Sequence, residues 1–123
     1  MKKVLVIEDN KDNLMLITMA LEHAGYQVIA AGTGEEGVQA ALDVRPFFIL
    51  MDINLPGIDG VEATKRIRSS DIGNTIPIIA ITSYAMLGDR DKIISAGCNG
   101  YFEKPIDPLT IIDKIHQIVG VGP

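Results

Sequence analysis

The residues best suited to chemistry are polar side chains that follow apolar runs: Glu8 and Asp9, Asp52, Thr82 and Lys104. If the runs before Glu8 and before Asp52 are neighbouring strands, three carboxylates converge in one shallow pocket. Their mutual repulsion would raise their pKa values unless a positive charge intervened. Mg²⁺ suits such a site because it takes oxygen ligands and keeps several waters, whose positions a phosphate oxygen can fill. The spacing therefore predicts a magnesium site.

Given that cation, the set favours phosphoryl transfer to a carboxylate. Asp52 can act as a nucleophile that forms an aspartyl phosphate. The metal, the Lys104 ammonium group and the Thr82 hydroxyl would then neutralise charge on the transferred oxygens. Pro56 and Gly57 favour a type II turn shortly after Asp52. Backbone carbonyls at the start of that turn are candidate metal ligands.

Each of these residues also has a plainer interpretation. Acidic residues at strand ends are commonly just solvated, and Thr82 is at home in a strand or turn. Together the residues fit this interpretation poorly. Asp52 directly follows the apolar residues 48–51, where a carboxylate without a partner would be poorly solvated.

The apolar runs that position these residues predict five short strands. The runs are rich in β-branched residues and span 4–7, 28–31, 48–51, 78–81 and 100–102. Segments with helical spacing separate them, and the runs do not alternate with polar residues. Both features are typical of an α/β fold whose parallel sheet is covered by helices. In such sheets ligands bind beyond the carboxyl ends of the strands, where the polar residues lie.

Five helices are predicted between and after the strands. Their apolar stripes are Leu14, Ile17, Leu21 and Ala24; Val38, Ala41 and Leu42; Val61, Thr64 and Ile67; Ile93 and Ala96; and Leu109, Ile112 and Val119. For the last helix, Asp107 is the predicted N-cap and Pro108 the first helical residue.

The last helix carries a second apolar line, formed by Ile111, Ile115 and Ile118. The combined stripe is wider than one buried face needs. The second line is therefore a candidate partner surface. A broad core stripe explains it equally well, and the sequence leaves both open.

Composition excludes several classes of protein. The 123 residues carry a net charge of -5, whereas a protein that grips nucleic acid directly normally has a basic face. No run approaches the roughly 18 apolar residues of a membrane span. The lone Cys98 forms no internal disulfide, which fits a reducing compartment and a buried structural role. These features predict a cytoplasmic protein.

Four segments in order carry a resemblance to a known family: residues 4–10, 49–60, 79–83 and 100–105. On them the chain resembles the receiver domain of bacterial two-component response regulators, of the single-domain type. The resemblance covers residues 1–123 as one domain, with about 1–119 ordered and 120–123 a tail or the start of a lost linker. It implies a flavodoxin-like, doubly wound sheet of five parallel strands in order 2-1-3-4-5 with five helices.

The resemblance also implies roles for individual residues. Asp52 would be the phosphoacceptor, in a reaction that needs Mg²⁺, with Mn²⁺ as a substitute. The metal would be held directly by Asp9 and Asp52, by Glu8 through water, and by the backbone carbonyl of Asn54. The remaining roles are phosphoryl binding by Lys104, switching by Thr82 and Tyr101, and tuning of the phosphate lifetime by Asn54 and Tyr84.

A protein of this family would be a signalling switch that catalyses only its own phosphorylation and dephosphorylation. The phosphodonor would be a sensor histidine kinase or a histidine phosphotransfer domain. The downstream partner would bind the surface of the fourth helix, fifth strand and fifth helix, and neither nucleic acid nor membrane would be contacted directly.

Three other functions remain as alternatives. A haloacid-dehalogenase-like phosphohydrolase also uses an Asp nucleophile, but it typically carries a second Asp two residues later, where this chain has Asn54. A structural module that has lost phosphorylation conflicts with the intact Asp52, Thr82 and Lys104. A flavin binder conflicts with Glu8 and Asp9, which would repel the flavin phosphate.

Overall fold

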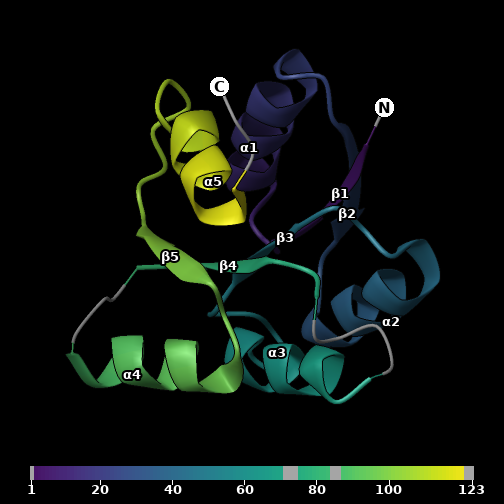
Figure 1. The fold of residues 1–123 in the computed structure, drawn as a ribbon, viewed down its shortest axis with the longest axis vertical. Helices are drawn as coiled ribbons and strands as arrows, with labels where there is room; N and C mark the ends of the chain where they lie inside the picture. The colour runs from purple at the N-terminus through teal and green to yellow at the C-terminus, as the bar shows by residue number, and fades with distance from the viewer. Residues whose placement is uncertain (1, 71–74, 84–86, 121–123) are drawn as a thin grey trace.

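The computed structural model describes residues 2–70, 75–83 and 87–120. Within them one parallel sheet of five strands runs in the order β2-β1-β3-β4-β5 (Figure 1). The strands are β1 (Lys3–Ile7), β2 (Gln27–Ala31), β3 (Ile49–Asp52), β4 (Ile78–Thr82) and β5 (Gly100–Glu103). This is the predicted flavodoxin-like architecture, and it confirms the predicted strand order.

Helices cover both faces of the sheet. On one face lie α1 (Lys11–His23) and α5 (Ile111–Val119), and on the other lie α2 (Gly34–Val44), α3 (Gly60–Arg68) and α4 (Leu87–Ala96) (Figure 1). None of the helices in the described parts of the chain is long and apolar enough to cross a membrane.

Two apolar cores result, because successive side chains of a strand point to opposite faces of the sheet. Leu5, Ile7 and Met51 pack with the helices of the α2–α4 face. Val6 and Leu50 pack on the other face, where α1 and α5 add four buried side chains, Ile17, Leu21, Ile111 and Ile115. The strand interiors are therefore apolar on both faces, and polar groups of these strands concentrate at their ends.

Two predicted core segments are more exposed than the apolar pattern indicated. In β2 only Ala31 is buried, because this strand lies at the edge of the sheet and has one neighbour. In α2 the side chain of Leu42 is 37% exposed, whereas Ala41 is fully buried. Adjacent apolar residues on a helix point about 100° apart, so only one of this pair can face the sheet.

The last helix begins three residues later than predicted. Thr110 is its N-cap and Ile111 its first residue. Asp107 instead closes a turn, since its side chain accepts a hydrogen bond from the backbone N–H of Leu109 at 2.9 Å. The side chain of Leu109 is 88% exposed, so the prediction that it lies in the core was wrong.

The apolar line of α5 that is most deeply buried is not the predicted one. Ile111 and Ile115 are 2% and 0% exposed and belong to the core, whereas Ile112, Ile118 and Val119 are half-buried. For Ile111 and Ile115 the prediction of a partner surface was therefore wrong, and the alternative of a core stripe is the correct one.

We expect Ile115→Ala to lower the free energy of unfolding by about 2–5 kcal/mol, because it leaves a cavity in a closed core. Leu109→Ala is the matched control, and its free energy of unfolding should change by less than about 0.5 kcal/mol because the side chain is exposed. Urea denaturation followed by circular dichroism measures both. Equal losses in the two variants would contradict the assignment of Ile115 to the core.

Cys98 is buried, as its predicted structural role requires. Its Sγ lies 3.6 Å from the hydroxyl of Thr64, and its side chain belongs to the core on the α2–α4 face. Burial raises the pKa of the thiol, although the hydrogen bond with Thr64 and the charge of Arg68 act against the rise. A thiol in this position is a poor nucleophile.

Candidate functional site

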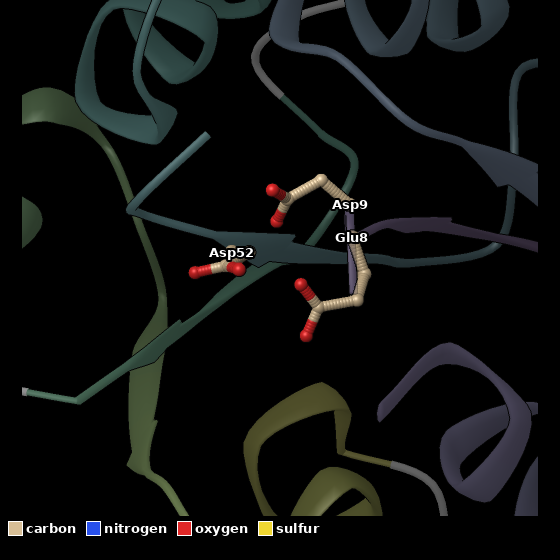
Figure 2. Close-up of side chains that lie close together, drawn as sticks. All are labelled: Glu8, Asp9 and Asp52. Carbon is tan, nitrogen blue, oxygen red and sulfur yellow. The ribbon is translucent and has the colours of Figure 1, made fainter. Parts of the chain in front are cut away.

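Three carboxylates meet at the carboxyl edge of the sheet. β1 and β3 are neighbours with Ile7 opposite Met51, so the residues that follow, Glu8 and Asp52, also lie side by side. One carboxylate oxygen from each of Glu8, Asp9 and Asp52 lies within 4.8 Å of the others (Figure 2). Glu8 and Asp52 are each 1% exposed, whereas Asp9 is open to solvent. The structure thus brings together the predicted acidic cluster.

Both oxygens of Asp52 have a partner. Oδ1 accepts a hydrogen bond from the backbone N–H of Asn54 at 3.0 Å. Oδ2 accepts one from the Nζ of Lys104, also at 3.0 Å. These two contacts fix the plane of the carboxylate. A buried carboxylate held in this way is oriented before it reacts, which lowers the entropic cost of an attack.

Lys104 bridges two of the acids. Its Nζ lies 3.3 Å from Oε1 of Glu8 as well as 3.0 Å from Oδ2 of Asp52. Burial acts to lower the pKa of Lys104, but the hydrogen bond and charge of Asp52, followed by those of Glu8, outweigh it and raise the pKa. Lys104 is therefore a firmly charged ammonium group in the site.

Glu8 holds its proton more tightly than an ordinary glutamate. Burial is the main cause, followed by a hydrogen bond with Asp52 and the charge of Asp52, and together they raise the pKa of Glu8 to about 7. Lys104 and the backbone N–H of Asn10 oppose this shift. Within the described residues, Oε1 of Glu8 is buried, and its polar partner is the ammonium group of Lys104, with which it forms an ion pair but no well-aligned hydrogen bond.

These observations fit a divalent cation. One ammonium group, that of Lys104, faces three carboxylates, so the side chains of the cluster do not balance its negative charge. The donors are hard oxygens, which suit Mg²⁺ or Mn²⁺ better than a metal that prefers nitrogen or sulfur. Glu8, Asp9 and Asp52 are the residues that can hold such an ion.

One dihedral angle of the turn after Asp52 agrees with the predicted type II turn. Gly57 has φ +75°, the value that the third residue of a type II turn requires and that glycine adopts without steric cost. Asn54 belongs to the site through its backbone N–H. Its carbonyl as a metal ligand stays a prediction.

The predicted switch residues lie on the two strands beyond β3. Thr82 is buried at the end of β4, and its carbonyl accepts a hydrogen bond from the backbone N–H of Lys104 at 2.8 Å. This bond places Thr82 and Lys104 at the same edge of the sheet. Tyr101 is half-buried in β5, opposite Ala80, and is not part of the acidic cluster. Tyr84 lies outside the described residues.

One contact of Tyr101 was not predicted. The guanidinium of Arg90 on α4 lies 5.4 Å from the centre of the Tyr101 ring, and it forms an ion pair with Glu103 at 3.5 Å. A cation near an aromatic face is attracted to it. No local pattern in the sequence marks Arg90, because the contact joins a helix to the next strand and depends on how the two pack.

Comparison with known proteins gives a family match over most of the chain. The family model of the response regulator receiver domain matches residues 4–116. The polar-differentiation response regulator DivK of Brucella anthropi is 40% identical over 119 residues, which are 97% of each chain.

Solved structures of receiver domains and related proteins are similar to this chain over nearly its whole length. The receiver domain of the sensor histidine kinase PA1611 from Pseudomonas aeruginosa is 36% identical, with a TM-score of 0.89 over 97% of this chain and 98% of that one. That structure has a magnesium ion coordinated in its active site cleft. The chemotaxis protein CheY4 of Vibrio cholerae is 27% identical, with a TM-score of 0.91 over 96% of this chain and 98% of that one.

Proposed function

Because this chain belongs to the response regulator receiver domain family, which acts in phosphorylation-based signalling, we propose that Asp52 is the residue that becomes phosphorylated. The observation that carries the proposal is the pairing of both Asp52 oxygens, with Asn54 and Lys104, inside a cluster of acids. Asp52 is buried at the end of a central strand, so its role is not that of a solvated surface acid.

In the proposed reaction an oxygen of Asp52 attacks the phosphorus of a phosphohistidine. A P–O bond forms, the P–N bond breaks, and its electron pair stays on the imidazole. Mg²⁺ or Mn²⁺, when held by Asp9 and Asp52 directly, by Glu8 through water and by the Asn54 carbonyl, would neutralise charge on the transferred oxygens. The donor is a sensor histidine kinase or a phosphotransfer domain, which implies a cytoplasmic protein.

Two side chains respond to the new phosphoryl group. Lys104 pairs with Oδ2 of Asp52 at 3.0 Å, and we propose that it transfers this pairing to a phosphoryl oxygen. The hydroxyl of Thr82 donates to another, since Thr82 is held beside Lys104 by their backbone hydrogen bond. Tyr101 then moves inward, and Asn54 and Tyr84 set how long the phosphoryl group lasts.

The signal leaves, in this proposal, through the face formed by α4, β5 and α5. A pocket of about 460 Å³ is formed by β5, the loop that follows it and α5, and its lining includes Tyr101, Ile106 and Ile118. Of the apolar residues predicted for a partner surface, Ile111 and Ile118 line this pocket, and Ile118 fits better because it is half-buried whereas Ile111 is buried. The partner is a protein, since a net charge of -5 does not favour nucleic acid.

The test is intact-mass measurement after incubation with acetyl phosphate. We expect an adduct of one phosphoryl group with Mg²⁺ or Mn²⁺ present and none in EDTA, because the uncompensated acids repel the donor. Turnover of phosphomonoesters would instead indicate a phosphohydrolase. An unmodified chain in the presence of Mg²⁺ would overturn the proposed function.

A further inference from the structure

The loop that joins β3 to α3 is tied to the sheet at its two ends. At its start, the N–H of Ile53 donates to the carbonyl of Ile81 at 3.0 Å, and the N–H of Asn54 donates to Oδ1 of Asp52 at 3.0 Å. At its end, the N–H of Gly60 donates to the carbonyl of Ile53 at 2.9 Å. Among these bonds none involves residues 55–58, the middle of the loop.

The middle of the loop is held from α2. The N–H of Ile58 donates to Oε1 of Glu35 at 3.3 Å, across 23 positions of sequence. The Glu35 carboxylate also lies against Gly57, since a Cβ at Gly57 would stand 2.6 and 2.7 Å from its two oxygens. Beside it, a Cβ at Gly34 would stand 2.5 Å from the carbonyl oxygen of Ile58. Gly34 is needed for this close approach because its Cβ would meet backbone, and Gly57 suits the loop because of its φ of +75°.

The start of α2 does not need Glu35 for itself. The hydroxyl of Thr33 accepts a hydrogen bond from the N–H of Glu36 at 3.1 Å, which caps the helix. The carboxylate of Glu36 accepts from the N–H of Gly32 at 3.2 Å. Glu36 thus serves the helix terminus, while the hydrogen bond of Glu35 goes to the loop. An acidic residue in the first turn of a helix is usually explained by its favourable interaction with the helix dipole. The helix dipole does not explain why Glu35 accepts a hydrogen bond from the loop.

We propose that Glu35 is a positioning residue for the metal and phosphorylation site. It fixes the middle of the loop, and the loop in turn carries Asn54, whose N–H orients Asp52. This inference rests on the proposed function, in which Asn54 also supplies a carbonyl ligand. Residues that orient metal ligands typically change metal affinity by about tenfold or more when removed.

The first test is backbone amide exchange in EDTA, measured by NMR. In Glu35→Ala the N–H of Ile58 should exchange about three- to tenfold faster than in the wild type, as expected for the loss of one hydrogen bond. Glu36→Ala is the matched control, because it removes the same charge from the same turn and should leave Ile58 unchanged. Both side chains are exposed, so both variants should fold.

The second test is Mg²⁺ affinity, measured by titration of the same proteins. Glu35→Ala should bind Mg²⁺ about tenfold more weakly, Glu36→Ala within twofold of the wild type, and Glu35→Gln, which keeps an oxygen acceptor, should retain most of the affinity. Equal losses in Glu35→Ala and Glu36→Ala, or in Glu35→Ala and Glu35→Gln, would assign the effect to charge and overturn the inference. A wild type that binds no Mg²⁺ would overturn the proposed function instead, while the exchange rates in EDTA still decide whether Glu35 holds the loop.

Discussion

Asp52→Asn should abolish phosphorylation of the chain by acetyl phosphate in the presence of Mg²⁺. The amide that replaces the carboxylate is a poor nucleophile, and it carries no charge for a cation. Asparagine still offers an oxygen to the N–H of Asn54, which bonds Oδ1 of Asp52 at 3.0 Å, so the loop should keep its shape. Intact-mass measurement should show an adduct on the wild type and none on the variant.

Asp59→Asn is the matched control for this experiment. Asp59 caps α3, where its side chain accepts a hydrogen bond from the N–H of Glu62 at 2.8 Å, and asparagine caps helices equally well. The control chain should be phosphorylated as the wild type is. An adduct on Asp52→Asn at the wild-type rate would show that another residue accepts the phosphoryl group.

The acidic cluster could be predicted because its position follows from two simple properties of parallel sheets. Uninterrupted apolar runs mark strands that are buried on both faces, and parallel strands place all their carboxyl ends at one edge. Polar residues immediately after those runs must therefore meet there. Glu8 and Asp52 do so in the structure, with Lys104 between them.

Features that depend on packing could not be predicted in the same way. The apolar lines of the last helix do not reveal which one faces the sheet, because that depends on how the helix packs, and the N-cap is Thr110 rather than Asp107. The exposure of β2 follows from its edge position, which its own residues do not encode and which only the family resemblance implied through the strand order. The contacts of Arg90 and Glu35 join segments that meet only in the folded chain.

Lys104→Met should separate the effect of Lys104 on metal binding from its effect on the transfer of the phosphoryl group. Nζ of Lys104 competes with a cation for Oδ2 of Asp52, from which it lies 3.0 Å, so its removal should leave Mg²⁺ affinity equal or higher. Phosphorylation by acetyl phosphate should nevertheless slow by about 10²–10³-fold, the usual cost of removing one group that stabilises a transition state charge. Mg²⁺ titration and the rate of adduct formation measure the two effects on one protein.

The same variant should also be less stable, but only without the metal. In EDTA, Lys104→Met leaves Glu8 and Asp52 buried without their cation, which should lower the free energy of unfolding by about 3 kcal/mol. Saturating Mg²⁺ should restore most of this loss, because it supplies the missing positive charge. Lys65→Met, an exposed lysine on α3, should change neither stability nor rate. If phosphorylation of Lys104→Met falls only in proportion to its Mg²⁺ affinity, Lys104 acts through the metal and not on the phosphoryl group.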